Sequence, residues 1–395
     1  MIENWVLNEL IQDLTDPFLI TALVLVVVHF GTPLAYYWYA KTRWLPRPWN
    51  IRVDGNYRPK VTVIVPTYNE AGFIEKKLNN IYEQEYPKDK LGVIIVDSAS
   101  DDGTAELVLK WASDHPNINL KLIEETERKG KARALNLALK QVHGDIVIIA
   151  DADAWWPSRD ALKEVVKWFA DPVVGAVSCL KKPADAGVAG VEEGYRRYYN
   201  VLRLAESKAW STPIFHGELA AFRRYLLENL NGFPTDIGAD DSHTASRIAL
   251  MGYRAIIPEE LWVEEAVPNE GYFWWRVRRG QHLIQHFART LKKIGEAPKE
   301  FRVVLAVESF LHLANPFLLL ASIVLLIASA MIAHSLTALS ILALGAVLLA
   351  IKQYRTWIVQ QFHLVVASLR NLWTKEIAWN KQSSLKLQYR SLSSS

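Results

Sequence analysis

The chain has 395 residues and a formal net charge of +3, and half of its residues are hydrophobic. This length is enough for a large soluble domain with additional segments, and the small net charge gives no argument for a nucleic-acid partner. The single cysteine, Cys179, excludes an intramolecular disulfide and agrees with a reducing cytosolic environment.

The first hydrophobic segment, residues 18–40, contains no Asp, Glu, Lys or Arg. About 20 apolar residues cross a bilayer as a helix, so this segment predicts one membrane span. The residues before it include acidic but no basic side chains, unlike a cleaved signal peptide. Basic residues follow it at once, and by the positive-inside rule they place the middle of the chain in the cytoplasm. They are Lys41, Arg43, Arg47, Arg52, Arg58 and Lys60.

Strand and helix signals alternate through the first half of the soluble domain, which we place at residues 51–298. β-branched runs predict strands, and apolar residues at helical spacing predict helices between them. The predicted strands are 61–65, 92–96, 119–123 and 146–150, and the predicted helices include 71–84 and 131–142. Such alternation predicts an α/β fold with a mostly parallel sheet, which binds ligands beyond the carboxyl ends of its strands.

Acidic residues follow three of these strands, within segments 66–70, 97–102 and 151–153. They should converge on one crevice, because parallel strands end at the same edge. One acid at such a place is usually a helix cap or a solvated turn, but three together indicate a nucleotide and metal site. Asp151 and Asp153 share one face of an extended chain and can hold a hard divalent cation together. The chain has neither a dinucleotide-binding glycine fingerprint nor a P-loop.

Four segments, taken in order, resemble the motifs of family 2 glycosyltransferases of the GT-A fold. They are Val-Pro-Thr-Tyr-Asn-Glu at 65–70, Val-Asp-Ser-Ala-Ser-Asp-Asp-Gly-Thr at 96–104, Lys-Gly-Lys-Ala-Arg-Ala-Leu-Asn at 129–136 and Asp-Ala-Asp at 151–153. The resemblance covers roughly residues 60–280, and the membrane layout is similar to the cellulose-synthase-like and hyaluronan-synthase-like branch. It implies a cytosolic GT-A domain joined to membrane helices, with a nucleoside diphosphate sugar and Mg²⁺ or Mn²⁺ bound to it.

The resemblance also implies roles for individual residues. Lys131 matches a basic residue near the nucleotide, Asp153 the principal metal ligand, and Asp151 a carboxylate beside the metal, sugar and nucleotide. The first two motifs hold the base and ribose in this family. By matching position, this role falls to Pro66, Tyr68, Glu70, Asp97 and Asp102.

Sugar transfer also requires a base for the incoming hydroxyl. Asp240 and Asp241 precede a predicted helix and resemble the family's Glu-Asp pair, so Asp241 is expected to be the base and Asp240 its neighbour. Adjacent carboxylates raise one pKa, which suits a base near neutral pH, whereas two helix-capping acids are the alternative. A nearby segment looks like the lining of the acceptor side. Its candidate residues are His216, Gly217 and Glu218.

Positive charge for the leaving diphosphate is expected from a helix near 272–295. Polymer-making relatives carry Gln-x-x-Arg-Trp here, often continued as x-Arg-Gly. Matching that ending leaves Phe273 and Val277 where Gln and Trp are expected, which argues against processive synthesis. Diphosphate binding by Arg276 and Arg279 remains the prediction, with a basic, Trp-rich helix resting on anionic lipid headgroups as the alternative.

The region 299–395 begins with a second uncharged segment, 309–351, long enough for two spans that turn at 333–335. Residues 356–369 are also uncharged but short and contain Gln360, Gln361 and His363, so they predict an interfacial amphipathic helix. A fourth span is the alternative and would place the basic tail outside, against the positive-inside rule. The tail contains Lys375, Lys381, Lys386 and Arg390.

These features predict a multi-pass cell-membrane enzyme with a cytoplasmic catalytic domain. We expect an inverting glycosyltransferase that moves a hexose from GDP-mannose or UDP-glucose to a lipid-linked saccharide or polyprenyl acceptor. A processive polysaccharide synthase is one alternative, although three spans form a thinner bundle than the larger synthases have. A non-catalytic scaffold that only binds nucleotide sugars is the other, and Asp241 argues against it because binding alone needs no base.

Overall fold

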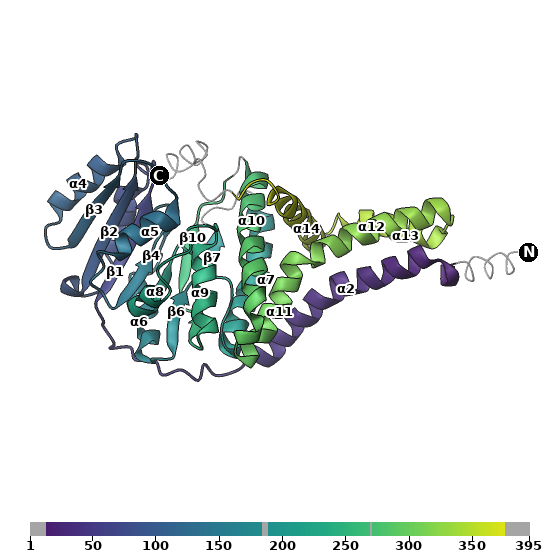
Figure 1. Ribbon diagram of the computed structural model, residues 1–395, viewed down its shortest axis with the longest axis horizontal. Helices are drawn as coiled ribbons and strands as arrows, with labels where there is room; N and C mark the ends of the chain where they lie inside the picture. The colour runs from purple at the N-terminus through teal and green to yellow at the C-terminus, as the bar shows by residue number, and fades with distance from the viewer. Residues whose placement is uncertain (1–12, 184–188, 269–270, 376–395) are drawn as a thin grey trace, which may run out of the picture.

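The structure is a computed structural model that describes residues 13–183, 189–268 and 271–375. Figure 1 shows a sheet-containing domain at one end, a layer of helices beside it, and long helices that extend away from that layer. The basic residues Lys381, Lys386 and Arg390 of the predicted tail lie outside the described residues.

A seven-stranded sheet forms the centre of the soluble domain, in the order β3-β2-β1-β4-β8-β6-β9. The first four of these strands pair in parallel, which confirms the predicted mostly parallel α/β sheet. In contrast, β8 runs antiparallel to both β4 and β6. The strands are β1 (Val61–Thr67), β2 (Leu91–Ser98), β3 (Asn119–Glu125), β4 (Ile146–Ile149), β6 (Val174–Ser178), β8 (Ala220–Arg223) and β9 (Arg254–Ile256).

Helices cover both faces of this sheet because successive residues of each buried strand point to opposite sides. In β1, Val63 packs in one core cluster with Leu78, and Ile64 packs in the other with Leu135. The helices of this domain are α3 (Ile74–Tyr82), α4 (Thr104–Asp114), α5 (Lys131–Leu139), α6 (Ala161–Val166), α8 (Arg224–Asn229) and α9 (Asp240–Leu250).

A second, three-stranded sheet lies beside the end of β4, in the order β5-β10-β7. Its strands are β5 (Ala154–Trp155), β10 (Trp262–Glu265) and β7 (Leu180–Pro183). Three helices form the layer next to it: α7 (Ala189–Ala209), α10 (Tyr272–Thr290) and α11 (Lys299–Leu313). The small sheet therefore connects the end of the main sheet to this helical layer.

The long helices are α2 (Pro17–Tyr39), α12 (Asn315–Ile332) and α13 (Leu336–Leu348). By length and composition, the helices spanning Pro17–Trp44 and Asn315–Ile332 could each cross a membrane. α13 meets that test only together with α14 (Lys352–Arg370), from which a bend of 105° separates it. The connection between α12 and α13 falls at the predicted turn, residues 333–335.

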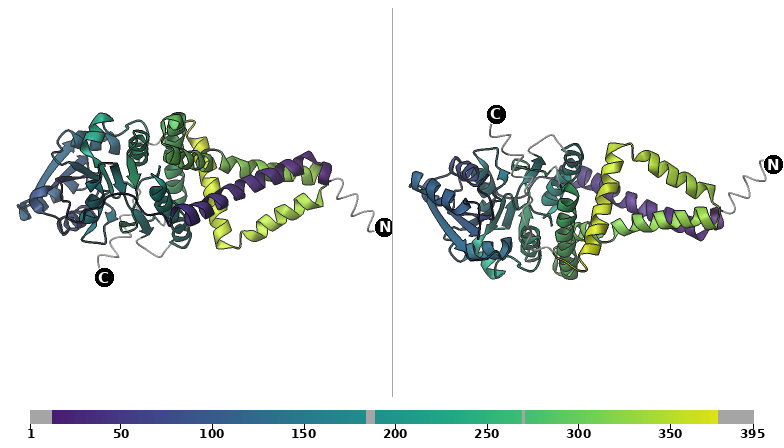
Figure 2. Two further views of the ribbon diagram at one scale, coloured as in Figure 1. Left: turned by 90° about the horizontal axis from the view of Figure 1, so that it is seen from below. Right: turned by 90° about the horizontal axis from the view of Figure 1, so that it is seen from above.

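After the bend, α14 lies across the inner end of the long helices and packs against α10 (Figure 2). The two helices approach closely at Gly280, where an added Cβ would be 3.1 Å from the Cβ of Ala367. Asn371 continues the contact by donating a hydrogen bond to the carbonyl of Gln281. As a result, α14 is attached to the same helical layer as the soluble domain.

Candidate active site

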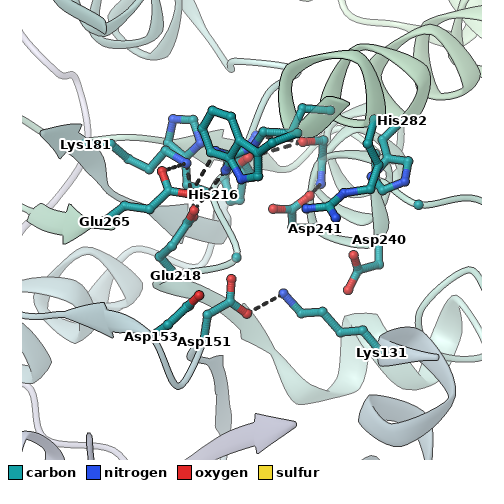
Figure 3. A pocket seen from close by; sticks show the side chains of 18 of the residues that line it. Lys131, Asp151, Asp153, Lys181, His216, Glu218, Asp240, Asp241, Glu265 and His282 are labelled. Atoms are coloured by element: carbon teal, nitrogen blue, oxygen red, sulfur yellow. Dashed lines mark hydrogen bonds and ion pairs between the residues drawn. The ribbon is translucent and has the colours of Figure 1, made fainter. Parts of the chain in front are cut away.

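A cavity of about 360 Å³ opens at the carboxyl ends of β1 and β4, between the main sheet and the layer of α7 and α10 (Figure 3). It contains the residues predicted from both halves of the domain, with the exception of Asp97 and Asp102. The predicted residues in its lining are Pro66, Tyr68, Glu70, Lys131, Asp151, Asp153, His216, Gly217, Glu218, Asp240, Asp241, Arg276 and Arg279.

Asp97 and Asp102 instead hold the turn beside the cavity. Asp97 is buried and accepts hydrogen bonds from the hydroxyl of Ser100 at 2.6 Å and that of Thr67 at 3.1 Å. Asp102 accepts one from the backbone N–H of Ala71 at 3.2 Å. Both carboxylates therefore fix the loops after β1 and β2, and a direct contact with the nucleotide stays a prediction.

Asp151 and Asp153 follow β4 and point into the cavity (Figure 3). The Oδ1 atom of Asp151 is 2.6 Å from Nζ of Lys131, the first residue of α5. Burial by itself would lower the pKa of Lys131, but the carboxylates of Asp151, Asp240 and Asp241 raise it above its usual value. Lys131 is consequently a permanent cation between the two acidic motifs.

These two aspartates fit a divalent cation that shares its ligands with a substrate. The described residues contain no group of three or more His, Cys, Asp or Glu side chains that could hold a metal ion. Mg²⁺ is typically bound by one or two carboxylates together with substrate phosphates, and Asp151 and Asp153 match that arrangement.

The chain after Asp153 is held by a polar stripe that runs along α3 and continues just beyond it to Gln84. The Nζ atom of Lys77 donates to the carbonyl of Ala154 at 3.0 Å, and Asn80 exchanges two hydrogen bonds with the backbone of Trp156, at 2.8 and 3.0 Å. Gln84 donates to the carbonyl of Ser158 at 3.0 Å. These three side chains are buried, so they fix the backbone that leaves the metal motif.

The candidate base belongs to a different element. Asp240 and Asp241 open α9, where the helix N-terminus favours negative charge. Burial nevertheless raises the pKa of Asp241 to about 7, and the carboxylate of Asp240 adds to the effect. Burial raises the pKa of Asp240 as well. A carboxylate with a pKa near neutrality is suited to act as a general base.

Gly217 marks the point at which the two acidic motifs meet. A Cβ added there would lie 2.7 Å from Nζ of Lys131, 3.3 Å from Oδ2 of Asp241 and 3.8 Å from Oδ2 of Asp151. The antiparallel pairing of β8 with β4 explains this position, because Ala220 lies opposite Ile149 and the segment before it continues past the end of β4. The absent side chain leaves room between the candidate base and the metal motif.

Buried ion pairs form the opposite wall. Glu218 binds Lys181 at 2.7 Å and Arg279 at 3.1 Å, and Glu265 binds the same two cations at 3.0 and 2.7 Å. His216 lies beside them, and burial lowers its pKa well below the usual value, so it is neutral. This network makes the wall rigid and nearly charge-balanced.

Arg276 is more deeply buried than Arg279, although the sequence predicts both as diphosphate ligands. Its guanidinium donates to Oε1 of Gln360 on α14 at 2.6 Å and lies 3.4 Å from Glu192 on α7. Its side chain is 7% exposed, compared with 31% for that of Arg279. Of the two predicted diphosphate ligands, Arg279 is therefore the more accessible from the cavity.

Comparisons with known proteins agree with this geometry. Residues 62–230 match the model of glycosyl transferase family 2. The mannosyltransferase PcManGT from Pyrobaculum calidifontis, solved in complex with GDP-Man and Mn²⁺, is 58% identical, with a TM-score of 0.83 over 89% of this chain and 98% of that chain. The chain belongs to glycosyltransferase family 2.

Two curated relatives of this family 2 glycosyltransferase match about half of the chain. The O-antigen chain rhamnosyltransferase RfbN of Salmonella typhimurium is 34% identical over 205 residues, 49% of this chain and 62% of the relative. Glycosyltransferase AglE of Haloferax volcanii is 40% identical over 196 residues, 49% of this chain and 63% of the relative. The match thus spans about three fifths of the length of each of them.

Several residues of the glycosyltransferase site were not predicted from the sequence. Lys181, Glu265 and Glu192 carry no local motif, because their role depends on the small sheet and α7 meeting the end of β4. Lys77 and Asn80 could have been noticed, since polar residues three apart interrupt an otherwise apolar face of α3.

Proposed function

We propose that this glycosyltransferase transfers a mannosyl residue from GDP-mannose to a lipid-linked saccharide at the cytoplasmic face of a membrane, with inversion at the anomeric carbon. The observation that carries this proposal is the convergence of Asp241, Lys131 and Asp151 on the space beside Gly217. Single-displacement sugar transfer requires a general base and a metal-diphosphate site on either side of the reacting carbon, and this space lies between the two.

The choice of donor follows from the mannosyltransferase relative, whose solved complex contains GDP-Man and Mn²⁺. With Asp151 and Asp153 as protein ligands, a bound Mg²⁺ or Mn²⁺ would neutralise charge on the leaving diphosphate. Lys131 orients Asp151 through their ion pair, and Arg279 supplies additional positive charge from the opposite wall.

The reaction then needs one proton transfer within the protein. The carboxylate of Asp241 accepts the proton of the acceptor hydroxyl while the hydroxyl oxygen forms its bond to the anomeric carbon. The bond from that carbon to the diphosphate breaks, and the nucleoside diphosphate leaves with the electron pair. Attack from the side opposite the leaving group inverts the anomeric configuration.

A lipid-linked acceptor is favoured by the position of the cavity against the helical layer. Arg276 links its wall to Gln360 of α14, on which Leu369 is 48% exposed. Leu372 and Trp373, just beyond α14, are 78% and 71% exposed. We infer that α14 lies in the membrane interface, with α2, α12 and α13 as spans. The basic residues after α2 support a cytoplasmic position of the soluble domain.

The proposal is tested with the full chain in lipid nanodiscs, supplied with GDP-mannose or UDP-glucose, Mn²⁺ and a membrane lipid extract. We expect the mannosyl group alone to enter the lipid fraction, as a single added sugar, and EDTA to prevent the transfer. Transfer from UDP-glucose but not GDP-mannose would exclude the proposed donor, and long polymer would favour a processive synthase.

The role of the base is tested in the same assay with Asp241→Asn. We expect transfer to fall by about 10²–10⁴-fold, since a positioned general base typically contributes this much. Binding of GDP with Mn²⁺ should stay within a few-fold of wild type. Asp236→Asn is a matched control, because Asp236 is exposed and bound to Arg289 before α9. Near-normal turnover of Asp241→Asn would remove this residue from the mechanism.

A further inference from the structure

The order of the strands indicates where the nucleobase of the donor lies, if the proposed function is correct. Asp151 and Asp153 follow β4, so the diphosphate lies at that side of the cavity. Moving away from β4, the sheet continues with β1, β2 and β3. The cavity extends the same way, with Tyr68 after β1, Ser98 at the end of β2 and Arg128 after β3 in its lining. The nucleoside therefore extends toward Arg128.

Arg128 is held ready for a ligand by an aromatic ring. Its guanidinium carbon lies 3.9 Å from the centre of the Tyr68 ring, a cation–π geometry that fixes the plane of the fork. Within the described residues, Lys131, Arg276 and Arg279 each pair with a carboxylate at the cavity, whereas Arg128 has no ion pair. Its guanidinium is thus oriented mainly by Tyr68.

A carboxylate lines the same cavity as this fork. It belongs to Glu70, whose charge raises the pKa of Arg128. Guanine presents two acceptors, O6 and N7, beside two donors, N1–H and the N2 amino group, and a bidentate arginine is the commonest partner of its O6 and N7 atoms. Uracil has no ring nitrogen acceptor beside O4, and its single N–H donor, N3–H, lies between two carbonyl acceptors with no amino group next to it. An arginine fork and a carboxylate in the same part of the cavity therefore fit guanine better.

We propose that Arg128 selects a guanine nucleotide over a uracil nucleotide by donating two hydrogen bonds to O6 and N7, with Glu70 accepting from N1–H and the N2 amino group. The ring of Tyr68 stacks against the guanidinium group of Arg128 and holds its orientation. Arg128 is then the specificity-determining residue of the donor site, and it acts on binding of the nucleotide and not on the chemical step.

Binding of GDP and of UDP to the full chain with Mn²⁺, measured by calorimetry in nanodiscs, tests this assignment without any turnover. We expect wild type to bind GDP more tightly than UDP. Arg128→Met should raise the Kd for GDP about 10–100-fold, the discrimination expected of a bidentate pair, while the Kd for UDP changes less than about 3-fold. Arg159→Met is the control, because Arg159 has a 70% exposed side chain and lies outside the cavity lining.

Arg128→Lys separates charge from geometry, since a lysine keeps the charge but lacks the fork. Under the proposal it also loses selectivity for GDP. A GDP preference that survives in Arg128→Met, or an equal loss of GDP and UDP affinity, would overturn the role of Arg128 while leaving the proposed donor intact. A wild-type preference for UDP would instead refute the GDP-mannose donor, and the selection of guanine with it.

Discussion

At the scale of single residues, burial and neighbouring charges give the carboxylates of the site different properties. Asp151 forms an ion pair with Lys131 at 2.6 Å. Asp241 is half-buried next to Asp240, and these surroundings raise its pKa to about 7. The same residue type is thereby suited to metal binding at one position and, under the proposed function, to accepting a proton at the other.

This division predicts the pH dependence of transfer. Asp241 can accept a proton only when it is ionised, so the rate at saturating donor should rise with pH through an apparent pKa near 7 and level off above it. The kcat measured between pH 5 and 9 checks this expectation, with GDP affinity followed over the same range as a control. A rate that is constant down to pH 5 would contradict it.

At the scale of elements, α3 has a function beyond covering the sheet. Its polar stripe fixes the backbone after the metal motif, and Trp156 extends this support by donating from its indole N–H to the carbonyl of Glu218 at 3.0 Å. Through Asn80 and Trp156, the same helix thus supports both the metal motif and the acceptor-side wall.

Asn80→Leu should consequently weaken both stability and metal dependence. The substitution leaves the buried N–H and C=O of Trp156 without their partners, at about 1–3 kcal/mol for each group. We expect a lower midpoint of thermal unfolding and a higher Mn²⁺ concentration for half-maximal transfer. Glu75→Gln on the exposed side of α3 should change the midpoint much less. An Asn80→Leu protein with unchanged Mn²⁺ dependence would contradict the role of this stripe.

At the scale of the whole chain, a hydrogen-bonded link joins α14 to the wall of the cavity. Gln360 of α14 accepts from both Nε and Nη2 of Arg276, whose guanidinium also stacks 3.9 Å over the ring of Tyr195 on α7. We therefore expect the position of α14 to influence the acceptor side of the cavity.

Gln360→Leu should uncouple these parts. Because Arg276 would lose both hydrogen bonds to Gln360 and keep its contacts with Glu192 and Tyr195, we expect about a tenfold lower kcat/KM for the lipid acceptor, equivalent to about 1.4 kcal/mol. The Kd for GDP should not change, because the donor lies at the other side of the cavity. Val359→Leu, at a 38% exposed position, is the control. An equal change in GDP affinity would indicate general disruption instead of uncoupling.

Much of the fold and of the donor side was predictable, because it depends on local pattern. The strands β1 and β4 are β-branched runs that end in polar residues, and parallel pairing brings those ends to one edge. The place of Asp240 and Asp241 at the start of a helix was predicted correctly for the same reason. The sequence also located the turn between α12 and α13, since the uncharged segment is too long for a single span.

The tertiary structure decided what the sequence could not: which of these residues face one another. The antiparallel β8, which the alternation of strands and helices did not predict, inserts Gly217 between Asp151 and Asp241. Asp97 and Asp102 hold the turns beside the cavity, and Arg276 binds Gln360, while their contacts with the nucleotide and the diphosphate stay predictions. The sequence determines the residues that carry the chemistry through short-range patterns. Their distances and pKa values depend on contacts between segments far apart in the chain, which only packing of the whole molecule establishes.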